Sequence, residues 1–127
     1  MTLLLDTHAF LFAVASQSKL SGKVRRMLAR TDVPRFVSII SLWEIMIKSQ
    51  LGKLPVPSSP DFFEDQALEL GAKLLLLDPR HIRALSTLPL HHKDPFDRML
   101  IAQAKEEGFT LASRDERFAA YGVNTIW

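Results

Sequence analysis

Five carboxylate side chains in this 127-residue chain stand where strand-like runs give way to helical patterns. They are Asp6, Glu44, Asp94, Asp97 and Asp115. Right-handed crossovers between parallel strands would bring these junctions to one sheet edge, where open α/β sheets bind ligands. Carboxylates gathered there raise one another's pKa unless a cation neutralises them. An all-oxygen cluster suits Mg²⁺ or Mn²⁺ rather than Zn²⁺ and could support metal-assisted hydrolysis of a phosphodiester.

The first of these acids follows the apolar run Leu3-Leu4-Leu5. A leucine run without polar alternation is typical of a parallel strand that is covered on both faces. A helical pattern begins directly after Asp6. We therefore expect Asp6 at the C-terminal end of a buried strand, beside the N-terminus of a helix.

The other four acids also have a purely structural explanation. Glu44 completes the capping-box pattern S-x-x-E that begins at Ser41. Asp94 precedes a proline suited to the first helical position, Asp97 would favour the positive end of that helix, and Asp115 follows a serine hydroxyl able to cap. Taken singly, each is more easily explained as a cap than as a ligand. Capping does not explain the strand-end acid or the recurrence of acids at these junctions.

The rest of the chain alternates between strand and helix patterns. Further strands are predicted at residues 36–40, 72–77, 109–112 and 123–126. Helices are predicted at residues 9–16, 23–30, 41–52, 61–70, 79–87, 95–107 and 113–120. This alternation predicts an α/β fold in which a mostly parallel sheet of about five strands carries helices on both faces.

Length and composition favour one globular domain, residues 1–127. The 47% hydrophobic and 24% charged residues are ordinary for a globular protein. The absence of cysteine excludes disulfides and thiolate chemistry and permits a reducing compartment. The apolar start lacks a basic region and is interrupted by Asp6, which argues against a signal peptide. It is also too short to span a bilayer. We therefore expect a cytoplasmic location and no membrane partner.

The charge balance is mildly basic, with a formal net charge of +2 and a pI near 9.2. This excess neither demands nor excludes a nucleic acid partner. If basic side chains lie beside the acids, they could hold an anionic polymer around a metal-loaded centre. The candidates are Lys48, Arg98, Arg114 and Arg117. On charge alone, an ordinary solvated surface is the favoured explanation.

Several other residues are expected to be structural. Adjacent histidines such as His91 and His92 point apart in a loop, which argues against a shared metal site. His8 is better explained as a helix-start residue than as a general base. Trp43 and residues 10–12 are expected in the core. The sequence contains no glycine-rich phosphate loop.

Taken together, four segments resemble the motifs of the PIN domain, especially those of VapC-like toxin ribonucleases of type II toxin–antitoxin systems. The segments are Asp6-Thr7, Ser41-x-x-Glu44, Asp94-Pro95-Phe96-Asp97-Arg98 with Ile101-Ala102, and Ser113-Arg114-Asp115. The resemblance covers the chain end to end. It rests on the order, spacing and strand-helix context of the segments, because no single one is specific.

The resemblance implies a three-layer α/β/α PIN-like fold and a Mg²⁺-dependent endoribonuclease, with Mn²⁺ as a possible substitute. It also implies a homodimer that is neutralised by a cognate antitoxin. The implied catalytic and metal-binding residues are Asp6, Glu44, Asp97 and Asp115. The implied supporting residues are Thr7 and Ser113, with Asp94 nearby.

The sequence departs from the family pattern at two positions. Ser113 stands where the family usually has threonine, so the hydroxyl is kept. Asp94 adds a second acid one helical turn before Asp97. We assign the metal-binding role to Asp97, because of its offset to Ile101-Ala102, and the capping role to Asp94.

Two alternatives remain at this stage. A phosphoryl-transfer enzyme could use Asp6 as a nucleophile, as HAD-like phosphatases use a strand-end aspartate, although His8 stands where their second aspartate is found. A non-catalytic binding module could keep the acids only as caps. We also expect self-association, because the apolar residues 9–15 and 27–28 exceed what a small sheet can cover.

Overall fold

The structure, a computed structural model, describes residues 1–57 and 59–127 and has one five-stranded parallel sheet in that part of the chain. The strands are β1 (Leu3–Leu5), β2 (Arg35–Ser38), β3 (Lys73–Leu75), β4 (Thr110–Ala112) and β5 (Thr125–Ile126). Their order is β3-β2-β1-β4-β5. The leucine run is therefore the central strand, and the predicted α/β class is confirmed.

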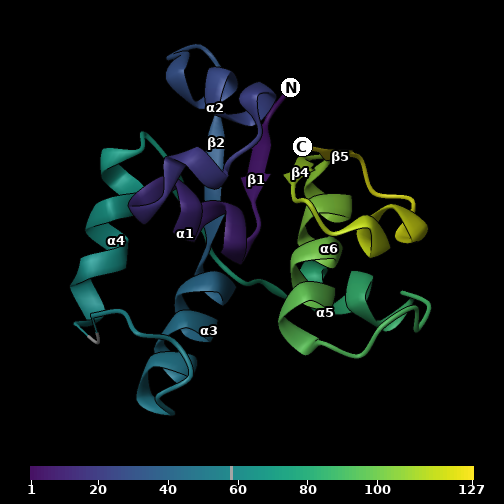
Figure 1. Cartoon of the computed structure of the whole chain (residues 1–127). Helices are drawn as coiled ribbons and strands as arrows, with labels where there is room; N and C mark the ends of the chain where they lie inside the picture. Colours follow the sequence, from purple (N-terminus) through teal and green to yellow (C-terminus); the bar gives the residue numbers. More distant parts are fainter. Residues whose placement is uncertain (58) are drawn as a thin grey trace.

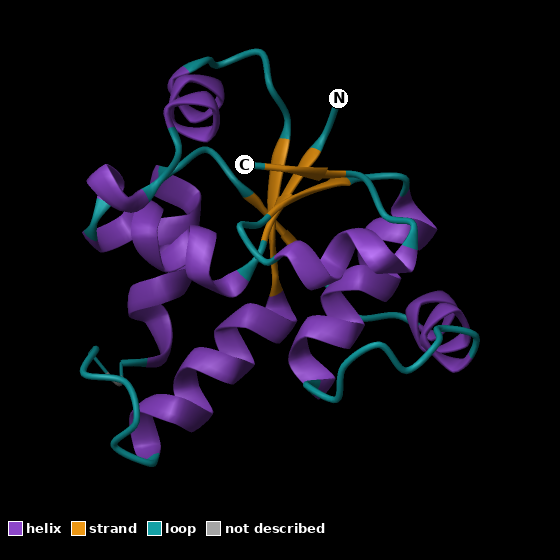
Figure 2. Cartoon of the chain, turned by 45° about the vertical axis from the view of Figure 1, so that its right-hand side comes forward, coloured by secondary structure: helices purple, strands orange, loops and turns teal. Residues whose placement is uncertain are grey.

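Helices cover both faces of the sheet (Figures 1 and 2). In chain order they are α1 (Thr7–Ala15), η1 (Gln17–Lys19), α2 (Gly22–Ala29), α3 (Ile39–Gln50), α4 (Pro60–Glu69), α5 (Pro79–Ser86), α6 (Pro95–Glu107) and η2 (Glu116–Tyr121), where η marks a 3-10 helix. Helices α1 and α4 lie on one side of the strands, and α5 and α6 lie on the other (Figure 1). This is the expected three-layer arrangement.

The side chains of the central strand alternate between two hydrophobic cores. Leu4 belongs to the core that α5, α6 and η2 cover, and Leu5 belongs to the core that α1, α2 and α4 cover. Phe10 fills the second core, where its ring meets Phe63 of α4 at 6.1 Å. Because successive residues of a strand face opposite ways, an all-leucine strand is what a sheet with two buried faces requires.

Several predicted helix ends are confirmed. Ser21 accepts a hydrogen bond from the backbone N–H of Val24 and caps α2. Asp94 caps α6, with Pro95 at the first helical position. Gly108 ends α6 with φ of 73°, a left-handed conformation that glycine adopts without strain.

The predicted start of α3 is wrong. The helix begins at Ile39, and Ser38 is its cap, because the Ser38 hydroxyl accepts a hydrogen bond from the N–H of Ile40. Ser41 and Glu44 consequently lie inside the helix and form no capping box. The β-branched pair at 39–40 has the pattern of a strand, and the tertiary structure instead places it in the first turn of the helix.

The predicted start of the last helix is also wrong. Residues 113–115 are not helical, and Asp115 rather than Ser113 caps η2. Ser113 instead accepts a hydrogen bond from the N–H of Asp115 at 3.1 Å. Both corrections move an acid relative to its helix, and they therefore change which acids have a capping role.

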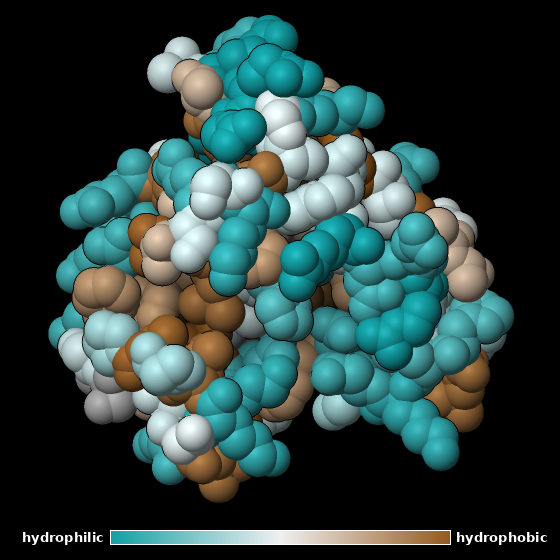
Figure 3. All heavy atoms as spheres, viewed as in Figure 1, coloured by the Kyte–Doolittle hydropathy of each residue, from teal (hydrophilic) through white to brown (hydrophobic). Residues whose placement is uncertain are grey.

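Two predictions about apolar residues need correction. Ala9, Phe10 and Ala13 are buried in the core, so the sheet covers much more of the first helix than the sequence suggested. Trp43, expected in the core, is 57% exposed. Exposed apolar side chains gather mainly over the α3 and α4 side of the molecule in Figure 3. No helix in the described part of the chain has the length and apolar character needed to cross a membrane.

Candidate active site

The C-terminal edge of the sheet brings the predicted acids together from four elements. Leu5 of β1 pairs with Ala112 of β4 on one side and with Val37 of β2 on the other. The N–H of Asp6 donates to the carbonyl of Ala112 at 3.1 Å, which fixes the first acid beside the segment that follows β4. Helix α3 leaves the end of β2 and packs against α6, which carries Asp97.

A cleft of about 610 Å³ opens at this edge. Its lining includes Asp6, Asp97 and Asp115 of the predicted quartet, together with Asp94. The other lining residues are His8, Arg114, Glu116, Arg117 and Phe118. Glu44 is not part of the lining and is only 3% exposed. The cleft is therefore polar and acidic, and its side near α6 and η2 is hydrophilic in Figure 3.

Asp6 has both a structural and a cleft-lining role. One carboxylate oxygen accepts a hydrogen bond from the N–H of Ala9 at 2.7 Å and caps α1. The residue is 5% exposed, and burial raises the pKa of its carboxyl, against the opposing effects of hydrogen bonds from Ser113 and Ala9. The capping role of Asp6 was not anticipated from the sequence, although a carboxylate directly before a helix is a usual cap.

Glu44 is held from two sides. The Thr7 hydroxyl donates to one carboxylate oxygen at 2.7 Å, and the Lys48 ammonium lies 2.5 Å from the other. The hydroxyl of Ser41 lies 2.9 Å from that of Thr7. This network joins the start of α1 to the second turn of α3. It also gives a structural basis for the predicted supporting role of Thr7.

Asp94 and Asp97 occupy different environments. Asp94 accepts a hydrogen bond from the N–H of Asp97 at 3.0 Å, as a helix cap does. The carboxylate of Asp97 makes no hydrogen bond to the described residues. The pKa of Asp97 is raised to about 7, first by burial and then by the charges of Asp94, Glu44, Asp6 and Asp115. Burial and the neighbouring acids thus both disfavour the charged form of Asp97.

Asp115 is neutralised within the chain. The guanidinium of Arg117 bonds both of its carboxylate oxygens, with 2.7 Å between Nη2 and Oδ2. These hydrogen bonds lower the pKa of Asp115. The same carboxylate accepts the N–H of Arg117 and caps η2.

The four predicted basic residues divide into two groups. Arg114 and Arg117 line the cleft, and the guanidinium of Arg114 lies 4.9 Å from the centre of the Phe12 ring. Arg98 instead donates to the carbonyl of Pro89 at 2.7 Å, and Lys48 is paired with a buried glutamate. Only the first pair faces the space where a phosphate chain could lie.

The donor set suits a hard divalent cation. Every side chain of the predicted quartet offers oxygen, and these are the ligands that Mg²⁺ and Mn²⁺ prefer. The pKa of Asp97 is raised by burial and then by the neighbouring acids, so added positive charge at this place would favour its carboxylate form.

A family model of the PIN domain matches residues 3–124. The chain belongs to the PIN domain family. Members of this family are nucleases, which places the protein among the hydrolases that act on nucleic acids. The match leaves the HAD-like alternative without support. Comparison with curated protein sequences gives no significant match.

Solved structures share the fold at low sequence identity. VapBC from Salmonella typhimurium bound to DNA aligns with a TM-score of 0.72 and 15% identity over 99% of this chain and 97% of that chain. VapBC2 from Rickettsia felis, bound to a promoter DNA fragment, aligns with a TM-score of 0.71 and 13% identity over 99% and 98%. FitAcB from Neisseria gonorrhoeae aligns with a TM-score of 0.66 and 16% identity over 98% and 96%. These likenesses support the PIN-like fold.

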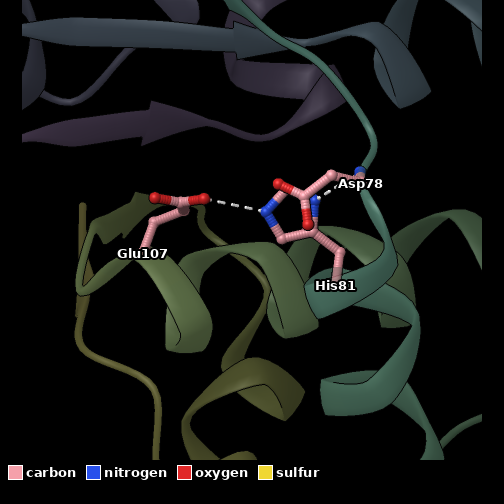
Figure 4. Close-up of side chains that lie close together, drawn as sticks. All are labelled: Asp78, His81 and Glu107. Carbon is pink, nitrogen blue, oxygen red and sulfur yellow. Dashed lines mark hydrogen bonds and ion pairs between the residues drawn. The ribbon is translucent and has the colours of Figure 1, made fainter.

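A second cluster in this PIN domain was not predicted from the sequence. Asp78, His81 and Glu107 have potential ligand atoms within 4.8 Å of one another (Figure 4). His81 Nδ1 accepts the N–H of Asp78 at 3.1 Å, Nε2 lies 2.9 Å from Glu107, and Arg80 bonds both acids. Both ring nitrogens are thus already engaged. The cluster fastens α5 to α6.

The histidines of the loop before α6 also have structural roles. The N–H groups of His91 and His92 both donate to the hydroxyl of Tyr121, at 3.1 and 3.0 Å. The His92 ring is stacked on Phe118, and burial lowers its pKa. The two backbone N–H groups thus anchor this loop to η2, which carries Tyr121.

Proposed function

We propose that this PIN domain is a Mg²⁺-dependent endoribonuclease toxin of the VapC type, able to use Mn²⁺. The observation that carries the proposal is the environment of Asp97. Its carboxylate faces the same cleft as Asp6 and Asp115, and its pKa is raised to about 7 by burial and by neighbouring acids. Titratable groups perturbed in this way are typical of functional sites.

The cation would be held by Asp6, Asp97 and Asp115, with Glu44 behind them. When bound, it would lower the pKa of a water molecule and stabilise the oxygen that leaves the phosphodiester. The protein fixes the orientation of these carboxylates. Asp6 is fixed by the start of α1, and Glu44 is fixed by Thr7 and Lys48.

The basic residues of the cleft would bind the substrate backbone. Arg114 and Arg117 line the cleft beside the acids, and a guanidinium matches phosphate oxygens with two parallel hydrogen bonds. The guanidinium of Arg117 is paired with Asp115 in this structure, so it would bind a phosphate only after a cation takes over the charge of that carboxylate. Ser113 is buried and bonded to the N–H of Asp115, so its role is to position that acid. We therefore assign Ser113 and Thr7 as positioning residues rather than catalytic residues.

The partners are proposed by analogy with the proteins that share the fold. Those structures are of VapBC and FitAcB, which are toxin–antitoxin complexes. We infer that this chain too is neutralised by a cognate antitoxin and forms a homodimer. Static light scattering of the chain alone tests the second point, since a monomer at high micromolar concentration would contradict it.

A non-catalytic role has one observation in its favour. Asp6, Asp94 and Asp115 all cap helices. Glu44 and Asp97, however, cap nothing and are the acids that such a role leaves unexplained. A protein that kept the acids only as caps would bind Mn²⁺ negligibly, so a metal titration separates the two functions.

The proposal is tested by measuring cleavage of a mixed RNA substrate with Mg²⁺, with Mn²⁺ and with EDTA. The wild type should cleave with either metal and not with EDTA. Asp6→Asn keeps the shape and can still accept the hydrogen bond from Ala9, but it removes a charge, and it should abolish cleavage while the protein stays folded. A folded Asp6→Asn variant that cleaves like the wild type would refute the proposed metal site.

A further inference from the structure

The ring of Phe12 holds two cationic side chains beside the acidic cleft. Phe12 lies on α1 and is half-buried. The guanidinium of Arg114 lies 4.9 Å from the centre of its ring, and the ammonium of Lys19, at the end of η1, lies 5.6 Å from the same centre. Arg114 also lines the cleft, whereas Lys19 lies beyond the lining. We call Arg114, Phe12 and Lys19 the basic path, because they lead from the cleft to the outer surface.

Neither cation of the basic path is neutralised by the part of the chain that the structure describes. Lys19 and Arg114 form no ion pair there, whereas Arg117, the other arginine of the cleft, pairs with Asp115. The sequence has no acid between residues 7 and 31. Contact with the aromatic ring holds the two charges in place, and charges this close repel each other unless an anion lies with them. The arrangement therefore suits a bound anion.

We propose that the basic path carries the RNA backbone out of the cleft, with Arg114 and Lys19 binding successive phosphates beyond the one that is cleaved. This inference rests on the proposed nuclease function and extends it to the course of the substrate. Phe12 is a positioning residue in this scheme, because it acts through the two cations that its ring holds.

The cleft favours a nucleic acid as the occupant of the path. A phosphodiester bound at the acids continues into neighbouring phosphates, so the substrate has to cross one side of the cleft. Asp94 and Glu116 would repel a phosphate chain, and the side of Arg114 would attract it. An RNA backbone supplies one charge per nucleotide along the whole path, and it joins that path to the bond that is hydrolysed. An acidic protein segment offers no phosphodiester to the cleft.

The first test measures how salt affects the binding of a single-stranded RNA, by anisotropy, to the cleavage-blocked Asp97→Asn protein. Adding Lys19→Gln should weaken binding about two- to fivefold at low salt. It should also reduce the slope of log affinity against log salt by about 0.7, the value for one phosphate contact with a single strand. Lys73→Gln is the control, because Lys73 is also exposed but lies on the edge strand β3, across the sheet from β4. Equal slopes for the two variants would overturn the inference.

The second test separates positioning by Phe12 from a purely structural role. Phe12→Leu keeps an apolar side chain for the core but removes the ring face that holds the cations, so it should reduce the salt slope. Phe12→Tyr keeps the face and should restore the slope. The effects of Phe12→Leu and Lys19→Gln should not add in the double variant, because both act on the same phosphate contact. A lower Tm with an unchanged slope would overturn the positioning role.

Competition with an acidic polypeptide tests the identity of the occupant. Poly-glutamate at the same charge concentration should displace the RNA weakly and without dependence on Lys19. If poly-glutamate competes as well as RNA does and with the same dependence on Lys19, the basic path serves an acidic protein partner, and the inference is wrong. Cleavage reports separately on the proposed function. A wild type that binds RNA through Lys19 but cleaves none would overturn the nuclease function and support the path.

Discussion

At the scale of single residues, Glu44 and Asp97 differ from the other acids of the cluster because the fold does not use them as caps. The negative charge of Glu44 is balanced by the ammonium of Lys48, 2.5 Å away. Asp97 has no such partner in the described chain, and its pKa is raised to about 7, first by burial and then by the charges of the neighbouring acids. A residue that costs stability without packing or capping is best explained by function.

The raised pKa predicts how stability depends on pH. A carboxyl whose folded pKa exceeds its unfolded value favours folding at pH values below about 3.8, and this contribution is lost as the pH rises through about 7. Asp97→Asn should therefore have a higher Tm than the wild type at pH 8. The two proteins should converge toward pH 4, where the wild-type carboxyl is also neutral. A Tm difference that is the same at pH 4 and pH 8 would contradict this account.

Asp94 should behave differently, because it caps α6 through the N–H of Asp97. Asp94→Ala should cost about 1 kcal/mol of stability, and Asp94→Ser should recover most of that. Both variants should retain cleavage, whereas Asp97→Asn should lose it by orders of magnitude. Thermal melts and cleavage rates decide the matter. If Asp94→Ser is as inactive as Asp97→Asn, Asp94 is part of the metal centre.

At the scale of elements, the sequence predicted every strand and the order of the helices, because the apolar runs and caps are local signals. It failed where two local signals competed. Ser38 and Ser41 are both plausible caps, and the isoleucines between them resemble a strand. The packing of α3 against α6 decided in favour of Ser38, which also donates to Gln103 of α6 at 2.6 Å. Such long-range contacts are not visible in a local pattern.

Arg35 connects several secondary-structure elements, a role that the sequence did not reveal. It is buried at the N-terminal end of β2 and donates to the carbonyls of Leu28, Arg30 and Leu70 at the ends of α2 and α4. These carbonyls have no partner within their helices, so the guanidinium joins two helix ends to the sheet. The nearby sequence gives no signal for this, since Arg35 looks like a surface residue before a strand.

We predict that Arg35→Met destabilises the protein by about 3 kcal/mol, because several buried carbonyls lose a charged donor. Chemical denaturation measures this loss. Arg30→Met is the matched control: its guanidinium pairs only with the exposed Asp32 in the described chain, and its loss should leave the unfolding midpoint unchanged. Equal effects of the two substitutions would refute the role of Arg35.

At the scale of the whole molecule, the two edges of the sheet have different tasks. The N-terminal edge holds Arg35, which stabilises the fold, and the C-terminal edge holds the acidic cleft with Arg114 and Arg117. The sequence predicted the acids because strand ends and helix starts mark them locally. It did not predict the exposure of Trp43 or the cluster of Asp78, His81 and Glu107, because both depend on how distant helices pack.

The central claim is that the acids around Asp97, and not the cluster around His81, form the divalent metal centre. Calorimetric titration of Mn²⁺ into three proteins at neutral pH tests it directly. The wild type and Glu107→Gln should bind Mn²⁺ with similar affinity, and Asp97→Asn should bind it much more weakly. Binding that survives in Asp97→Asn and is lost in Glu107→Gln would place the metal at the other cluster and contradict the account.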